Sequence, residues 1–163
     1  MAKEIQLTQG KVALVDDDMY EYLNQWKWYA SGSHGKFYAR RNLRINKKYL
    51  GCILMHRLIV KNTDSKMHTD HFNGDTLDNR KENLRICTAS ENLRNQKKHY
   101  NNKSGYKGVG KYDNNKLKFR AYITYEKKRV HIGYYNTEKE AARAYNEAAV
   151  KYHGEFANLN KID

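Results

Sequence analysis

The chain has 163 residues, of which 39% are hydrophobic, and this suits one ordinary domain or two small ones with small cores. Its 31 Lys and Arg against 18 Asp and Glu give a net charge of +13, which favours nucleic acid over a membrane surface as the partner. The sequence has no apolar run of about 18 residues and no secretory signal, and its two cysteines exclude a four-Cys zinc site and suit reduced thiols in a cytosolic protein.

Residues 1 to about 60 form a β-rich extension. Short apolar and β-branched runs predict strands over three stretches: 11–15, 36–43 and 49–60. A short helix fits 16–28, and helical spacing over 54–61 gives a second interpretation of the end of the last strand. Packing on the next region and extra DNA contacts both remain open as roles for this extension.

The second region, residues 66–98, has the order strand, loop, strand, helix. MHTDH predicts a short strand, NGD at 73–75 is a strong turn signal, and ENLRICT at 82–88 fits the returning strand. Thr88 and Glu91 have the spacing of a capping box, which predicts a helix from Ala89 to about residue 98.

The third region begins after a polar linker, residues 99–104. Three alternating segments predict an antiparallel sheet: 106–112, 118–126 and 128–135. Thr137 opens a second capping box, small and apolar residues follow at helical spacing, and Gly154 is a natural stop. The chain therefore divides into residues 1–98, the linker and a sheet-and-helix domain over 105–163, and the fold class is α+β.

The second region places Asp, His and Asn where they can perform chemistry. In a strand-loop-strand-helix fold the end of the first strand faces the first helical turn, which brings Asp70 and Asn92 together. Their oxygens suit Mg²⁺ or Mn²⁺ better than zinc and leave most coordination positions for water and a phosphate. His71 can take a proton from an attacking water, and Asn83 can hold the His71 ring by accepting a hydrogen bond. The alternative interpretation is an Asn-rich surface loop, which is what a lone Asp-His pair usually marks.

Neighbouring residues carry weaker signals. Arg85 is a candidate phosphate contact, although a solvated strand Arg is nearly as good an interpretation. Asn79 fits a side chain that closes the loop, and Cys87 fits a core position. His56 and His68 either contact DNA, line the site or have no functional role.

The same stretch resembles the HNH nucleases, in the variant with Asn in the third motif position. The matching segments are DH at 70–71, GD at 74–75, ENLR at 82–85, EN at 91–92 and, upstream, MHRLIV at 55–60. The resemblance is to phage and intron-encoded homing endonucleases, and it implies a ββα-metal unit. It also implies that Asp70 and Asn92 hold one divalent ion, that His71 is the general base and that Asn83 orients it. The missing third His leaves one imidazole ligand fewer, which bears on metal preference and turnover.

A basic stretch follows the motif. Residues 94–131 hold twelve Lys and Arg against Asp113 and Glu126, a net charge of +10, interleaved with aromatic side chains on the predicted strands. Alternation along paired strands puts one set of side chains on the helix and the other outward. A twisted basic sheet of this kind fits a DNA major groove, whereas the simpler interpretation is a solvated face.

Residues 105–160 resemble the plant ethylene-response-factor (APETALA-type) DNA-binding domain. The matching segments are YKGV at 106–109, RVHIGYY at 129–135 and TEKEAARAYNEAAVKYHGEFANLN at 137–160. The resemblance implies DNA contacts from four residues: Lys107, Lys111, Arg129 and His131. Lys118 and Arg120 are expected as additional contacts. The two strand Trp residues of the plant domains are missing from this region, so the base preference of the plant domains does not carry over.

Together these features predict a metal-dependent endonuclease that hydrolyses a phosphodiester in duplex DNA, of homing or phage type. A ββα-metal unit would cut, and a three-stranded sheet packed on one helix would grip the duplex. A single site makes nicking the default, and a double-strand break would need a dimer or two events. We expect a monomer or weak dimer without a small-molecule cofactor, in the cytoplasm of a bacterium or a phage-infected host cell. The alternatives are a catalytically inactive DNA-binding regulator and an RNA-binding protein.

Overall fold

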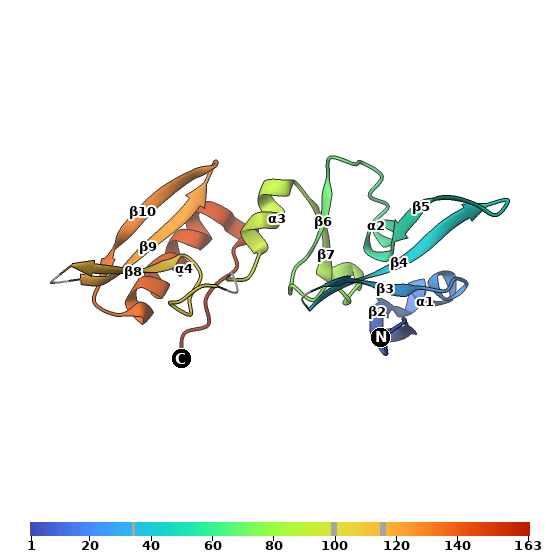
Figure 1. Ribbon diagram of the computed structural model, residues 1–163, viewed down its shortest axis with the longest axis horizontal. Coiled ribbons are helices and arrows are strands. Elements are labelled where there is room, and N and C mark those ends of the chain that lie inside the picture. The colour runs from blue at the N-terminus through green and yellow to red at the C-terminus, as the bar shows by residue number, and fades with distance from the viewer. Residues whose placement is uncertain (34, 99–100, 115–116) are drawn as a thin grey trace. The chain divides into compact units, whose positions relative to one another are not determined.

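The computed structural model describes residues 1–33, 35–98, 101–114 and 117–163. It divides into two compact units, Met1–Asn92 and Leu93–Asp163, and the fold is mixed α/β with several small antiparallel sheets (Figure 1). The division falls a few residues before the expected linker, of which residues 99 and 100 lie outside the described residues. Within the described part of the chain, none of the helices is both long and apolar enough to cross a membrane.

Unit 1 begins with a hairpin and a short helix. The strands β1 (Ala2–Gln6) and β2 (Val12–Asp16) pair antiparallel, and α1 (Asp17–Asn24) follows directly. Alternation along β2 buries Ala13 and Val15. β1 was not predicted from the sequence, because only one of its five residues is buried.

A three-stranded antiparallel sheet comes next, in the order β3–β4–β5. Its strands are β3 (Tyr29–Ser33), β4 (Lys36–Ile45) and β5 (Lys48–Leu54). The helix α2 (Met55–Ile59) starts where β5 ends, so the strand predicted over 49–60 is wrong in its second half, and the alternative helix is found there. Met55 is fully buried in the core of unit 1, and this burial favours the helix.

The segment that carries the motif has the predicted order. The strands β6 (His68–His71) and β7 (Leu84–Cys87) pair antiparallel, and α3 (Ala89–Asn95) follows. The predicted capping box is present: the Glu91 carboxylate accepts from the N–H and hydroxyl of Thr88, and the Glu91 N–H donates back to Thr88 Oγ1. The helix ends at Asn95, short of the expected residue 98.

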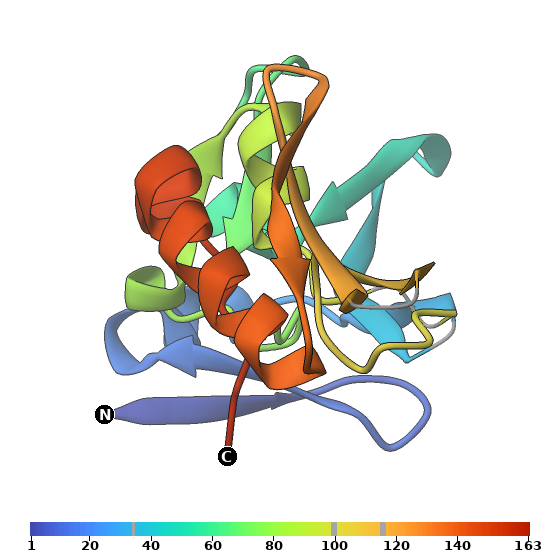
Figure 2. The same cartoon turned by 90° about the vertical axis from the view of Figure 1, so that its left-hand side faces the viewer.

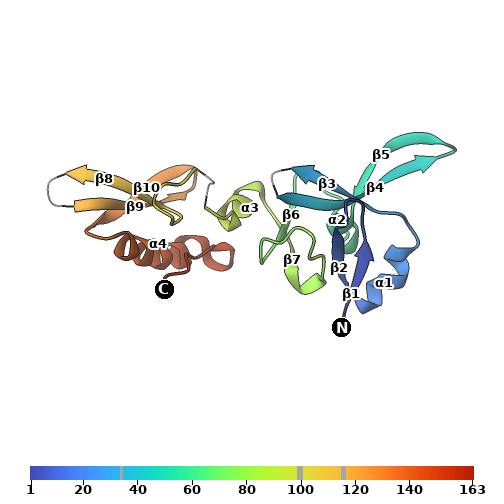
Figure 3. The ribbon, with the colours of Figure 1, turned by 60° about the horizontal axis from the view of Figure 1, so that its bottom comes forward.

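Unit 2 contains a second three-stranded antiparallel sheet, in the order β10–β9–β8, with a long helix on one face (Figure 2 and Figure 3). Its elements are β8 (Val109–Asn114), β9 (Leu117–Tyr125), β10 (Lys128–Tyr135) and α4 (Glu138–His153). Thr137 and Glu140 form the predicted capping box. The sheet lies so close to α4 that a Cβ at Gly108, where φ is +73°, would come within 2.0 Å of the Tyr145 ring.

Candidate active site

The pairing of β6 with β7 sets the position of the two best candidate residues. Asp70 lies opposite Arg85 and His71 lies opposite Leu84 in the antiparallel register. Asp70 and His71 are 5% and 4% exposed, so both belong to the interior rather than to a surface loop. The interpretation as an Asn-rich surface loop therefore does not describe the Asp-His pair.

Arg85 is held against Asp70. Its Nε donates to the carboxylate oxygen Asp70 Oδ2 at 2.8 Å, and its Nη2 lies 2.7 Å from the same oxygen as an ion pair. The ring of Phe72 lies 5.1 Å from the guanidinium carbon. A charge-assisted pair in this setting compensates the buried carboxylate, so Arg85 is neither a solvated strand residue nor an isolated cation.

His71 is buried next to two rings and one amide side chain. The imidazole centroid is 5.1 Å from that of His56 and 6.2 Å from the Tyr38 ring. Burial lowers the pKa of His71, and the Asn79 side chain opposes this shift by acting as a hydrogen-bond acceptor. The neutral imidazole that results is the form that can accept a proton.

Asn79 is the amide that faces the His71 imidazole. It is fully buried, its N–H donates to the carbonyl of Leu14 and its side-chain Nδ2 donates to that of Leu77. Its Oδ1 is buried without a hydrogen-bond partner of good geometry among the described residues, although it influences the His71 pKa as an acceptor. From the sequence, Asn79 was expected only to close the loop.

The Asn83 side chain performs the task expected of Asn79. Its Oδ1 accepts from the N–H of Asn73 at 2.9 Å, and its Nδ2 donates to the carbonyl of Asp78 at 2.7 Å. Both bonds cross the loop between β6 and β7 and close it. This differs from the expected direct orientation of His71 by Asn83, because the hydrogen bonds of the Asn83 amide go to the loop backbone.

Of the two rings near His71, His56 was one of three open interpretations from the sequence, and Tyr38 was not identified. His56 is 5% exposed, and burial, together with the charges of His71, Arg57 and Arg40, lowers its pKa to about 3. Tyr38 packs on it with ring centroids 5.5 Å apart. Both residues come from elements outside the motif, and the only sequence signal was the match of MHRLIV upstream.

The expected metal ligands, Asp70 and Asn92, both act on the Cys87 thiol. Burial raises the pKa of the Cys87 thiol to about 11, with a further contribution from the charge of Asp70, while the N–H of Asn92 opposes the shift. The Asn92 side chain lies 3.4 Å from Nδ1 of His68. Two hard oxygens fit a divalent ion that keeps water and phosphate as its other ligands. In the part of the chain that the structure describes, no three His, Cys, Asp or Glu cluster as a complete metal site.

In unit 2, four of the six expected DNA-contacting residues lie on one exposed face of the sheet. They are Lys118, Arg120, Arg129 and His131. The Arg129 guanidinium carbon lies 4.5 Å from the centroid of the Tyr122 ring on this face. Lys111 is exposed but pairs with Phe119, whose ring packs against the α4 side, so Lys111 lies on the opposite face.

Lys107 is the clear departure from the expected DNA contacts. Its Nζ donates to the carbonyls of Arg94 and Gln96, both at 2.5 Å, where α3 ends. Burial lowers the pKa of Lys107 to about 8. The ammonium thus satisfies carbonyls at a helix C-terminus, and these bonds do not support the DNA contact expected of Lys107, which stays a prediction.

Comparison with known proteins agrees with this site. Residues 54–94, from the end of β5 to α3, match the HNH endonuclease family. Over 158 residues the chain is 31% identical to an uncharacterized HNH endonuclease of Acanthamoeba polyphaga mimivirus, an alignment that covers 95% of this chain and 78% of the relative. No solved structure gives a significant match.

The chain belongs to the HNH endonuclease family, whose members are nucleases acting on DNA. HNH nucleases generally use a divalent metal ion.

Proposed function

We propose that this protein hydrolyses one phosphodiester of duplex DNA per encounter in a reaction that depends on Mg²⁺ or Mn²⁺. The observation that carries the proposal is the buried His71 at the end of β6, next to Asp70, which is paired with Arg85. Burial lowers the pKa of His71, which favours its neutral form. A neutral imidazole in the matched family segment is suited to act as a general base. One site per chain makes nicking the default outcome, and the role as a homing or phage enzyme is part of the proposal.

His71 deprotonates the attacking water, and two amides hold it for this step. Asn79 positions the ring by accepting from it, and Asn83 acts at a distance by fixing the loop that follows β6. A general base that is held in place contributes roughly 10²–10⁴ to the rate.

Asp70 and Asn92 would hold the divalent ion. When bound, this ion stabilises the charge that develops on the phosphate and on the leaving oxygen. Arg85, which is paired with Asp70, would also steady the phosphate.

Unit 2 is proposed to grip the duplex in the manner of the ethylene-response-factor domains. The support is its three-stranded sheet with α4 on one face, and an opposite face that carries Lys118, Arg120, Arg129 and His131. Contacts from such a face to the DNA phosphates give affinity, and contacts to the bases give sequence preference. The free thiols suit a reducing cytoplasm as the place of action.

A plasmid-nicking assay with and without Mg²⁺ tests the proposal. The wild-type chain should relax supercoiled plasmid only with Mg²⁺ or Mn²⁺, and Asp70→Ala should lose that activity. Asn92→Asp should keep it or change the metal preference, because Asp also supplies an oxygen. Tight duplex binding without cleavage under any divalent ion would favour the inactive regulator, and preferential binding of RNA would favour the third alternative.

A further inference from the structure

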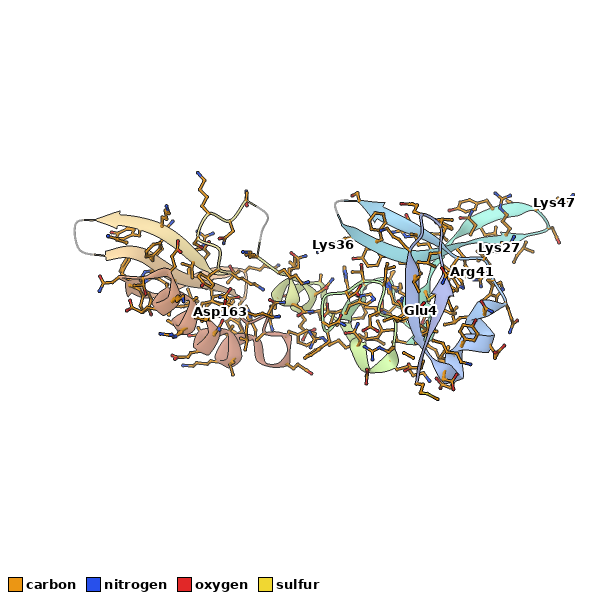
Figure 4. The ribbon with its side chains drawn as sticks, turned by 90° about the horizontal axis from the view of Figure 1, so that it is seen from below. Glu4, Lys27, Lys36, Arg41, Lys47 and Asp163 are labelled. Carbon is orange, nitrogen blue, oxygen red and sulfur yellow. The ribbon has the colours of Figure 1, made fainter. Side chains whose placement is uncertain are left out.

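Unit 1 has a strongly basic segment that the proposed function does not use. Residues 22–63 contain nine Lys and Arg and no Asp or Glu. This segment forms the β3–β4–β5 sheet and α2. Figure 4 shows Lys36 at one end of the sheet and Lys47 at the turn at the other, with Arg41 between them.

The two faces of β4 differ in what they contact. Phe37 and Ala39 belong to the core of unit 1, and Arg41 stacks over the Trp26 ring at 4.2 Å. The alternate residues point the other way. We call this second set the basic face of β4, and it consists of Lys36, Tyr38, Arg40, Asn42 and Arg44.

The basic face of β4 leads directly to the catalytic base. Its Tyr38 ring lies 6.2 Å from His71 and 5.5 Å from His56, measured between centroids. The next residue on this face, Arg40, is close enough for its charge to act on His56. A ligand bound along the face would therefore reach the site at Tyr38.

The cations of this face differ from other cations of unit 1 in their partners. Among the residues that the structure describes, Lys36, Arg40 and Arg44 form no ion pair, and Arg40 Nε is buried without a hydrogen-bond partner. Elsewhere in unit 1, Lys3 pairs with Asp17 at 2.7 Å, and Lys81 pairs with Asp18. Lys36 and Arg44 are exposed, so an external anion can reach them.

We propose that the basic face of β4 binds the phosphate backbone of the duplex and leads it to His71, so that unit 1 has a DNA-binding surface of its own. This inference rests on the proposed function and adds a second contact surface to the one on unit 2. From Lys36 to Arg44 an extended strand covers about 26 Å, or about 7–8 phosphates of one strand at 3.4 Å of helix axis each. Hydroxyl groups from β3, at Ser31 and Ser33, flank the same face.

The test compares two double variants in the full chain with His71→Ala, which removes cleavage. Lys36→Gln with Arg44→Gln removes two cations from the face. Lys3→Gln with Lys81→Gln removes two exposed cations that already have carboxylate partners. Fluorescence anisotropy with a random duplex, measured over a range of salt, gives affinity and the log–log salt slope.

We expect the face variant to bind at least about tenfold more weakly, with a slope smaller by about 1.8, and the control to match its parent. Lys36→Arg with Arg44→Lys keeps both charges and should restore binding, which separates charge from misfolding. Equal affinity and slope in the two double variants would overturn the proposal, and so would a loss that the charge-preserving variant does not restore. Stronger competition by an RNA duplex of the same sequence would overturn the choice of DNA as the occupant.

This binding readout is independent of cleavage. If the wild-type chain fails to nick plasmid but the variant with Lys36→Gln and Arg44→Gln still loses DNA binding, the proposed nuclease function is wrong and the proposed DNA-binding surface on β4 is supported. If the wild-type chain nicks plasmid and this variant binds DNA as well as its control, only the proposed DNA-binding surface on β4 is rejected.

Discussion

Arg85 and Asp70 form a buried cross-strand pair in which both Nε and Nη2 of the guanidinium meet one carboxylate oxygen. The side chains are 16% and 6% exposed, so neither charge has much access to water. Asp70 is also an expected metal ligand. Its carboxylate would therefore bind two partners, Arg85 in the folded structure and a divalent ion during catalysis.

Arg85→Ala should lower the stability of unit 1 by roughly 3 kcal/mol, because it leaves a buried carboxylate without its partner. Urea denaturation followed by Trp fluorescence measures this, since Trp26 and Trp28 are the only two Trp of the chain and both lie in unit 1. Mg²⁺ should restore part of the loss by replacing the guanidinium. A loss of stability that is the same with and without Mg²⁺ would remove Asp70 from the proposed ligands.

His71→Ala should reduce nicking by roughly 10²–10⁴ while duplex binding changes little. The reason is that the base acts on the water, whereas affinity should come from Lys and Arg. Single-turnover nicking and anisotropy on the same preparation give both quantities. Full-rate cleavage by this variant, together with binding tenfold weaker, would show that His71 is a contact residue and not the base.

Replacing Asn79 and replacing Asn83 should have different effects, one on kcat and the other on stability. Asn79→Ala should lower kcat at saturating DNA, because the His71 ring loses the acceptor that faces it. Asn83→Ala should act mainly through stability, because it breaks two loop hydrogen bonds whose buried partners each cost about 1–3 kcal/mol when unpaired.

Assays well below the melting temperature of each variant distinguish these effects. A large fall in kcat for Asn83→Ala without a fall in melting temperature would restore Asn83 as the residue that orients His71 directly.

His56 should make unit 1 less stable in acid. Its pKa is about 3 in the folded chain against 6.5 ordinarily, so the unfolded chain binds its proton more readily and stability falls as pH drops from 6.5 toward 3. At about pH 5 the loss should be about 2 kcal/mol relative to neutral pH. His56→Phe keeps a ring against Tyr38 and should remove this part of the pH dependence, as followed by Trp fluorescence. The exposed His131→Phe serves as the control, and equal pH profiles for the two variants would contradict the assignment.

Lys107 and Arg129 are both cations of unit 2, but their replacement should affect different properties: stability for Lys107 and DNA binding for Arg129. Arg129→Ala, if it reads a base, should cost about 1–3 kcal/mol of binding and relax preference at one position. Lys107→Ala should lower the stability of unit 2 instead, since its ammonium holds the end of α3, and should leave the salt slope unchanged. A slope smaller by about 0.9 for Lys107→Ala would return this residue to the phosphate contacts.

The features that could be predicted from the sequence are those that depend on residues close together along the chain. Both capping boxes and the β6-loop-β7 order depend on residues close together in the chain, and these predictions agree with the structure. The catalytic roles of Asp70 and His71 stay predictions. The contacts of Tyr38 and His56 with His71 depend on how β4 and α2 pack on β6, which no local pattern encodes. The partners of Lys107 were not predicted for a related reason: charge and a family match indicate a cation, but only packing decides whether its Nζ meets solvent or a carbonyl.

The two cysteines give the chain a selective attachment point for a probe. Cys87 is buried and its thiol stays protonated because its pKa is raised to about 11, whereas Cys52 is exposed on β5 opposite Asn42, a member of the basic face of β4. Thiolates are the reactive form, so a maleimide dye should attach at Cys52 and spare Cys87. A fluorophore there would stand beside the proposed duplex track, with no engineered residue, and its quenching by labelled DNA would report occupancy of that face in real time.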